Sequence, residues 1–511
     1  MNTEKDKPRK LLIVADLGAS NPKFIISFKK NEPDYLILDS RIQKVPASLV
    51  DKYRKKDEWF IDEPLASADA FLKLSNEDDY WVFGDLSQYF DPEQRLDKEA
   101  KKYELGALRI LCGLGILTQQ QGIKHRNFNL DLCVLLPVNE FGDQEPFLKY
   151  FENIAKNWWF RGEAFSCTLR KTKIDREGAS TLRYLLSNKQ YKDKYRNQTL
   201  GLVMAGYRNL SLFVLRKGKA EIQESPIQGF HKCVENICCH NATIKPTELN
   251  AALANAYYSL LPYELEEFPQ KIYDKFKGVY LNIGENSSGK NKKFDSYLTQ
   301  KEQTPEGKLF RYHFLNYSND SDDVIFKFKR TGKVPDFSNC EEIKQLIKIQ
   351  NPYNVAQELN LLIDDLNKEI NAYGDEFKFF LERYLKDIDQ LIVIGGASIF
   401  LYSWVTDFCN YYDLLEIDSQ KMLFSPPYEK SDYFYNPERK VIKIDSLPQL
   451  KEELVKDFSL DEKEQIYSSI PLRFLDCYCF YKLCLNQIKK EDQEERRQKK
   501  AKEMSKEGAE N

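Results

Sequence analysis

The feature that most constrains the fold is a pattern that occurs twice along the chain, in which three short β-rich segments precede a helix. The β-rich segments are 11–16, 24–28 and 35–40 in the first half, and 199–206, 209–218 and 220–227 in the second. The turns between them are short, so each trio predicts an antiparallel meander. The chain therefore predicts an α/β protein whose second half repeats the architecture of the first, without obvious sequence identity between the two.

Further segments complete each half. Helical spacing marks 96–117, 144–159, 177–187, 341–349 and 355–385, strands are predicted at 129–138 and 164–174, and 390–405 reads as a strand followed by a helix. Residues 81–90 predict a short strand that ends in a turn, and the polar stretch 188–198 separates the halves. Residues 285–338 are polar and predict a surface insertion, while 489–505 carry mixed charges and predict a solvated helix.

Length and charge exclude several classes of protein. A chain of 511 residues is too long for one compact core, so two or three domains are expected. The 76 basic and 79 acidic residues give a net charge of −3, which offers no overall basic field for direct nucleic-acid binding. No apolar run reaches the roughly 18 residues that a membrane span needs. Most of the eleven cysteines lie in apolar stretches, as reduced buried thiols would, so a cytoplasmic protein is expected.

The first candidate site is the loop DLGASNPK, residues 16–23. A phosphate site needs backbone N–H groups turned toward the anion, small residues and a nearby cation. Gly18 and Ala19 are small, Ser20 and Asn21 can donate hydrogen bonds, and Lys23 supplies the positive charge. Taken alone, the same residues also fit an ordinary hairpin turn.

A second candidate is the turn IGGAS, where the apolar run 390–394 meets Gly395, Gly396, Ala397 and Ser398 before a helical segment. Two glycines at a strand-to-helix turn let a flat group such as adenine or ribose lie against the backbone. A turn that packs a helix closely on its strand is the alternative interpretation.

Two other motifs indicate less. Gly284, Gly289 and Lys290 have the spacing of a P-loop, but residue 291 is Asn, which lacks the hydroxyl that such a loop offers to Mg²⁺. The cluster HKCVENICCH, residues 231–240, contains histidine and cysteine without the paired spacing of a zinc site, so it predicts a packed helix instead.

Together, the loop DLGASNPK, the strand LDLCVLLPV and the turn VIGGAS resemble the actin-like nucleotide-binding superfamily, and most closely its ParM/StbA type of bacterial ATPase. The resemblance covers about residues 11–485 and implies two duplicated, ribonuclease H-like α/β domains that face each other across a nucleotide cleft. It implies a first domain at 1–175 that helices at about 461–488 complete, and a second at 176–460. The insertion 285–338 and the charged helical tail 489–511 stay outside it.

The resemblance also implies roles for the motif residues. Asp16 would hold Mg²⁺ through water, Gly18 to Asn21 and Lys23 would bind the β- and γ-phosphates of ATP, and Gly395 to Ser398 would contact the adenosine. Glu177, in the connection between the domains, would orient the attacking water.

The second phosphate loop departs from the family pattern of Asp-apolar-Gly-Gly-x-Thr. The aligned stretch is MAGYRNLS, in which Met204 replaces the acid and Gly206 is retained. Arg208 and Asn209 can still donate to phosphate. Because a lost carboxylate affects hydrolysis more than binding, the sequence predicts nucleotide binding and leaves ATP turnover open.

Three functions fit these observations. The first is an ATPase that self-associates into filaments and segregates plasmids or other DNA through a DNA-bound adaptor protein, without direct contact to nucleic acid or membrane. The second is a structural or regulatory filament protein that binds nucleotide without hydrolysing it, which Met204 and Ser211 favour. The third is a small-molecule kinase of the same superfamily, for which the sequence offers no substrate signature.

Overall fold

The architecture comes from a computed structural model of the chain. It describes the residue ranges 8–18, 21–29, 32–57, 65–91, 102–225, 229–241, 243–256, 337, 340–350, 352–385, 387–409, 443–445, 447–460 and 470–507. The insertion predicted at 285–338 lies almost wholly outside these ranges, as does the P-loop-like stretch from Gly284 to Lys290. Across the described part of the chain, none of the helices combines the length and apolar character that a bilayer span requires.

The first half is built on a sheet of mixed direction. Its main strands are β1 (Arg9–Asp16), β2 (Lys23–Lys29), β3 (Glu32–Ile37), β7 (Asn127–Leu136) and β9 (Glu163–Arg176). They lie in the order β3-β2-β1-β7-β9, with β2 antiparallel to both β1 and β3, and with β1, β7 and β9 parallel. Short antiparallel strands extend this sheet beyond β9: β8 (Trp158–Phe160), β5 (Phe71–Leu74), β6 (Tyr80–Phe83) and β4 (Ile42–Val45).

The second half repeats that arrangement. Its strands are β10 (Thr199–Ala205), β11 (Leu210–Arg216), β12 (Lys219–Glu224), β13 (Gln390–Ile394) and β14 (Lys443–Asp445). They lie in the order β12-β11-β10-β13-β14, again an antiparallel meander followed by two parallel strands. The prediction of a duplicated α/β architecture is confirmed, because both sheets place their first three strands and their two later strands in the same order.

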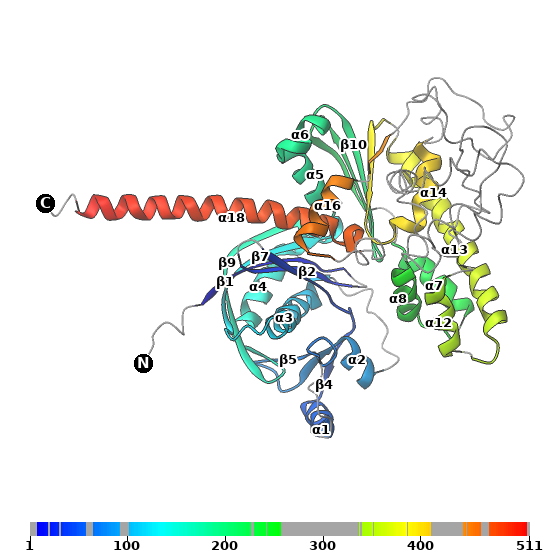
Figure 1. Cartoon of the computed structure of the whole chain (residues 1–511), viewed down its shortest axis with the longest axis horizontal. Helices are drawn as coiled ribbons and strands as arrows, with labels where there is room; N and C mark the ends of the chain where they lie inside the picture. Colours follow the sequence, from blue (N-terminus) through cyan, green and yellow to red (C-terminus); the bar gives the residue numbers. More distant parts are fainter. Residues whose placement is uncertain are drawn as a thin grey trace, which may run out of the picture.

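Helices cover the outer faces of both sheets (Figure 1). In the first half, α3 (Lys102–Gln120) and α4 (Gln144–Ala155) share a hydrophobic core with the sheet. In the second half the covering helices are α7 (His231–His240), α8 (Pro246–Asn255), α12 (Glu341–Gln350), α13 (Val355–Tyr384) and α14 (Ser398–Cys409). The cysteine-rich helix α7 packs as predicted, since Cys233 and Cys238 are buried in this core.

A third core joins the two halves. Helices α5 (Ala179–Ser187), α16 (Pro448–Asp457) and α18 (Ile470–Glu507) lie between the sheets. Val14 and Leu135 of the first sheet and Leu202 and Ile392 of the second belong to the same buried cluster as these helices. The two sheets are therefore held against one shared layer of helices.

The structure differs from the predicted elements at several points. The turn predicted within 81–90 is a helix, α2 (Gly84–Phe90), which follows β6. The helix predicted at 144–159 ends at Ala155, because Trp158 and Phe160 pair with β5 as strand β8. The polar stretch 188–198 contains α6 (Lys189–Tyr195), whose first turn is capped by the side chain of Asn188.

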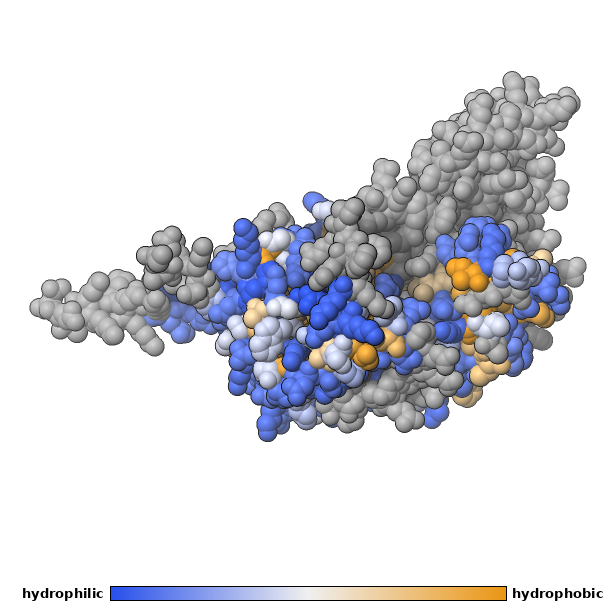
Figure 2. Space-filling model, turned by 90° about the horizontal axis from the view of Figure 1, so that it is seen from below, coloured by the Kyte–Doolittle hydropathy of each residue, from blue (hydrophilic) through white to orange (hydrophobic). Residues whose placement is uncertain are grey.

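The surface is unevenly polar. Figure 2 shows a face that is mostly hydrophilic over the first half, while hydrophobic residues gather toward the end of the molecule that α12 and α13 occupy. Ile349 in α12 and Phe379 in α13 are 75% and 67% exposed, and Tyr353 between these helices is 94% exposed. On this face, the coloured residues of the second half are thus the more apolar.

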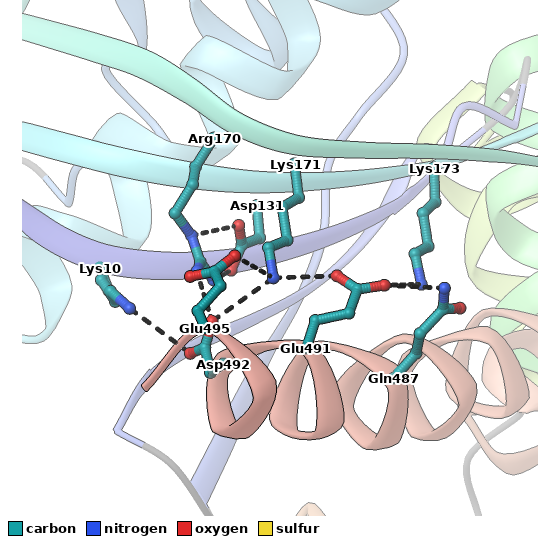
Figure 3. A network of polar contacts seen from close by, with 9 residues as sticks. All are labelled: Lys10, Asp131, Arg170, Lys171, Lys173, Gln487, Glu491, Asp492 and Glu495. Atoms are coloured by element: carbon teal, nitrogen blue, oxygen red, sulfur yellow. Dashed lines mark hydrogen bonds and ion pairs between the residues drawn. The ribbon is translucent and has the colours of Figure 1, made fainter. Parts of the chain in front are cut away.

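The predicted tail is continuous with α18, and its first residues contact the first sheet (Figure 3). Asp492 pairs with Arg170 of β9 at 2.5 Å, and Glu491 pairs with Lys171 at 2.9 Å. Burial would raise the pKa of Asp492, but hydrogen bonds and charge from Arg170 and charge from Lys10 lower it to about 2. The beginning of the predicted solvated helix is therefore docked by ion pairs.

One buried carboxylate fixes the connection between the halves. Asp476 of α18 accepts hydrogen bonds from the N–H groups of Gly178 at 2.7 Å and Thr181 at 3.0 Å, and from the Thr181 hydroxyl at 2.9 Å. Gly178 has a φ of +87°, which turns the chain from β9 into α5. Since Asp476 is 3% exposed, the first turn of α5 is anchored to α18 inside the core.

This anchor predicts a pH-dependent stability. Burial raises the pKa of Asp476 from 3.8 to about 7, more than its hydrogen bonds lower it. The folded protein then holds this proton more tightly than the unfolded chain, so the stabilisation present below about pH 4 is lost as the pH rises toward 7. The quantity to measure is the free energy of unfolding of the wild type minus that of Asp476→Asn. We expect this difference to fall by on the order of 1 kcal/mol per pH unit as the pH rises from about 4 to 7. Urea titrations at several pH values measure it, and a constant difference would contradict the assignment.

Candidate functional site

The three predicted loops converge on one cleft between the halves. Its empty space is about 870 Å³, with the solvent at its mouth included. Loops that follow β1, β10 and β13 line it, together with the connection after β9. Within each sheet, the parallel pairing of β1 with β7, and of β10 with β13, puts the carboxyl ends of those strands at the same edge. Loops from both of these edges line the cleft.

The β1–β2 loop contributes Asp16, Gly18, Asn21 and Lys23 to the cleft. Lys23 Nζ and Asp16 Oδ2 form an ion pair at 2.6 Å, and their side chains are 12% and 2% exposed. A Cβ atom at Gly18 would lie 3.1 Å from the Asn21 carbonyl oxygen and 3.4 Å from Lys23 Nζ, so glycine leaves room for the ammonium group. Ala19 and Ser20, which were predicted with this loop, are outside the described residues.

The β10–β11 loop contributes Gly206, Arg208 and Asn209 to the cleft. Its carbonyl groups are turned away toward the start of α7. The carbonyls of Gly206, Tyr207 and Arg208 accept hydrogen bonds from the N–H groups of residues 230, 231 and 229, at 3.2, 2.7 and 2.8 Å. The loop is thus held rigidly, with its side chains available to the cleft.

The turn after β13 contributes Gly395, Gly396 and Ala397. Gly395 has a φ of +96°, and a Cβ atom there would lie 2.4 Å from the carbonyl oxygen of Ala205. That same oxygen accepts a hydrogen bond from the Ala397 N–H at 3.1 Å, which ties this turn to the end of β10. The Ser398 hydroxyl donates to the Gly395 carbonyl at 2.7 Å, so it closes the turn and does not line the cleft.

Glu177 lines the cleft from the connection between β9 and α5. It is 4% exposed, and its N–H donates to the Leu136 carbonyl at 2.8 Å. The next residue, Gly178, is the one that Asp476 anchors. The position of this carboxylate therefore depends on the same contact that joins α5 to α18.

An ion pair joins the two halves. Arg208 Nη2 of the second half lies 3.5 Å from Glu140 Oε1 of the first half, in the short helix η1 (Val138–Asp143) after β7. Both side chains are largely buried, at 18% and 6% exposure. Near them, burial lowers the pKa of Arg109 to about 10; the charge of Asp39 opposes this and that of Arg208 adds to it. The second loop thus carries the guanidinium of Arg208, and it lacks the acid that the family pattern has at the position of Met204.

An apolar wall of the cleft was not predicted. Tyr207, Phe230 and Phe400 line it, and the rings of Phe230 and Phe400 stack with centroids 4.6 Å apart. Leu253 and Asn250 of α8 also line it. The two phenylalanines adjoin the loops in sequence, but nothing in the pattern of α8 distinguishes its cleft residues from other residues of a packed helix.

Arg473 of α18 is a further lining residue that the sequence analysis did not include. Its Cγ would lie 3.5 Å from a Cβ atom at Gly396, so the side chain runs along the IGGAS turn. The sequence held one signal for it, since Arg473 is a cation within the apolar segment IPLRFLDCYCF, where charge is uncommon without a partner.

The donor set was tested against the Mg²⁺ that the resemblance implies. Mg²⁺ prefers carboxylate, phosphate and water oxygens. Two acids, Asp16 and Glu177, line the cleft. Asp16 forms an ion pair with Lys23, and Met204 occupies the position at which the family pattern has another strand-end acid. Among the described residues, no group of three or more His, Cys, Asp or Glu could hold a metal ion. The described residues therefore offer no cage of protein carboxylates, and a Mg²⁺ held through water by Asp16 would take its other oxygens from phosphate and water.

Two α/β halves with the same strand order face a cleft that is lined from the carboxyl ends of their strands. This is the actin-like fold. No protein-family model matches the chain, and no curated protein matches it.

Solved structures of similar fold include apo psk41 ParM, with 13% identity, 94% of this chain and 99% of that chain covered, and a TM-score of 0.44. Actin-like protein Alp7A is 10% identical over 95% and 98%, with a TM-score of 0.46. The archaeal actin homologue Ta0583 is 10% identical over 93% and 99%, with a TM-score of 0.41. The strand order of the two sheets identifies the fold. The function of these proteins is not transferred to this chain, because all three TM-scores are below 0.5.

The IGGAS turn generates a prediction about stability. Gly395→Ala combines a strained φ with a clash against Ala205, so we expect it to lower the free energy of unfolding by more than about 2 kcal/mol. Gly122→Ala is the matched control, because Gly122 has a φ of +59° and nothing within 4 Å of the added Cβ atom. Its expected loss is about 1 kcal/mol. Urea unfolding compares the two, and equal losses would contradict the close packing of this turn on β10.

Proposed function

We propose that this protein binds a nucleotide in the cleft between its two halves. One observation carries the proposal: three loops that are far apart in sequence, each singled out for a chemical reason, line the same cleft. They contribute Asp16, Gly18, Asn21 and Lys23, then residues 206–209, and then residues 395–397. An ordinary hairpin turn or packing turn would not be expected to line the same cavity as the other two loops. The shared cavity therefore favours the phosphate and adenosine interpretations over those alternatives.

Each wall of the cleft suits one part of a nucleotide. We propose that Lys23, Asn21 and the backbone from Gly18 through Ala19 and Ser20 bind phosphate, with Arg208 and Asn209 donating from the opposite loop. The Gly395–Gly396–Ala397 turn allows ribose or base to approach the backbone, and Ser398 supports that turn. Tyr207, Phe230 and Phe400 provide an apolar wall for a base, whose flat ring gains from aromatic contact.

The resemblance implies that the nucleotide is ATP. The residues of the site favour slow hydrolysis of this nucleotide. We propose that Glu177, which lines the cleft, orients a water near the phosphates. Met204 offers neither charge nor hydrogen bonds at the end of β10, so a strand-end acid is missing from the opposite side. The Mg²⁺ that the resemblance implies at Asp16 stays a prediction, and phosphate and water would supply most of its oxygens. We propose a protein that binds ATP tightly and hydrolyses it slowly or not at all.

We propose further that nucleotide binding controls self-association into filaments. This part rests on the resemblance to ParM/StbA-type proteins, in which cleft closure and head-to-tail stacking are coupled. A head-to-tail contact is heterologous and does not close on itself, so it produces a filament. A role in plasmid or DNA segregation through a DNA-bound adaptor follows from the same resemblance, and the net charge of −3 agrees with an indirect contact to DNA.

The first prediction from this proposal concerns the phosphate loop. Lys23→Ala and Asp16→Ala should each abolish the rise in melting temperature that ATP produces, because each removes one partner of the ion pair that shapes the loop. Both changes also lower the melting temperature itself, so the readout is the difference with and without ATP. Lys44→Ala is the control, since Lys44 pairs with Glu77 outside the cleft and is 42% exposed. An unchanged response to ATP in both loop variants would refute the assignment.

The second prediction separates filament formation from hydrolysis. The full chain is mixed with ATP, ADP or a non-hydrolysable ATP analogue, and phosphate release and sedimentation are followed together. We expect sedimentation with ATP and with the analogue, and little phosphate release. Release at the same rate as assembly would indicate an ATPase with normal turnover, and transfer of phosphate to a metabolite would indicate a kinase.

A further inference from the structure

Three cations line or reach into the cleft, and their surroundings differ. Lys23 is paired with Asp16 at 2.6 Å, and Arg208 with Glu140 at 3.5 Å. For Arg473, the described part of the chain shows no ion pair and no hydrogen bond from the side chain. Within the described residues, the cleft thus holds a positive charge that has no direct partner.

The environment of Arg473 makes that charge unfavourable without a ligand. Burial lowers the pKa of Arg473 to about 10, against the opposing influence of the Asp16 carboxylate. Asp16 itself is already engaged by Lys23, so it offsets the guanidinium from a distance only. A partly buried charge without a direct partner destabilises a fold, and an anion bound beside it removes that penalty.

We propose that Arg473 binds a phosphate group of the ligand directly, and that the cleft neutralises the ligand's phosphates with Lys23, Arg208 and Arg473 in place of a divalent metal. The inference rests on the nucleotide binding proposed above and deepens it. Arginine suits this role, because its planar guanidinium can hold two oxygens of one phosphate at once. Its place beside Gly396 puts it between the phosphate loop and the IGGAS turn.

The loss of the strand-end acid is consistent with this charge balance. A carboxylate at residue 204 would add negative charge near Arg208 and favour a metal ion beside the phosphates. Met204 adds none, and it is 8% exposed within the core that joins the halves. Two arginines line the cleft, and one strand-end acid is replaced. The positive side chains can therefore neutralise the phosphates, as a metal ion would otherwise do.

The first test uses Arg473→Met, which removes the charge and keeps most of the volume. We expect the affinity of the full chain for ATP, measured by calorimetry without added metal, to fall about 10- to 100-fold. The melting temperature of the ligand-free variant should stay equal or rise, because a charge without a direct partner has been removed. Arg473→Lys should recover part of the affinity. Arg216→Met, at the far end of β11 from the cleft, is the matched control and should bind like the wild type.

The second test compares ATP affinity in the presence of Mg²⁺ and of a chelator. We expect a difference below about threefold, and a loss above about tenfold in chelator would overturn the metal-independent part of the proposal. Unchanged affinity in Arg473→Met would overturn the role of Arg473 while leaving nucleotide binding intact. A wild-type chain that binds no nucleotide under either condition would refute the proposed function itself, and this inference with it.

Discussion

The parallel pairing of β1 with β7, and of β10 with β13, is the constraint on which the rest of the molecule depends. In this register Asp16 lies opposite Leu135, and Met204 lies opposite Ile394. All four residues are at the carboxyl ends of their strands, so every chain segment that leaves these ends must turn at the same edge of its sheet. A shift of one residue would reverse the faces of these strands and separate the loops.

Much of this arrangement could be predicted from the sequence because its determinants are local. A β-rich run, a short turn and a glycine-rich loop each reveal themselves within about ten residues, and both meanders were found that way. Strand β14 could not be predicted, because three residues contain no periodicity and Lys443–Asp445 becomes a strand only by pairing with β13. The helix at 144–159 was overextended for a related reason, since only the pairing with β5 distinguishes Trp158 and Phe160 from helical residues.

The residues of the candidate site also fall into those that the sequence could reveal and those that it could not. Lys23, Arg208 and Gly395 belong to loops whose composition shows their chemistry, whereas Asn250, Leu253 and Arg473 reach the cleft only because distant helices pack there. The departure at Met204 was visible in sequence, but its consequence depends on the charges around it. Glu140, which pairs with Arg208, follows a strand of the other half and carries no local sign of that role.

Helix α18 connects the ligand cleft to the joint between the halves. Arg473 lines the cleft, and Asp476, one turn later on the same helix, anchors Gly178 and Thr181 at the start of α5. The residue before Gly178 is Glu177, which returns to the cleft. A small shift of α18 would therefore act on both walls at once, because close-packed interiors transmit displacement to their neighbours. Arg208 lines the cleft and also pairs with Glu140 of the first half, so the same side chain belongs to the ligand site and to the contact between the halves.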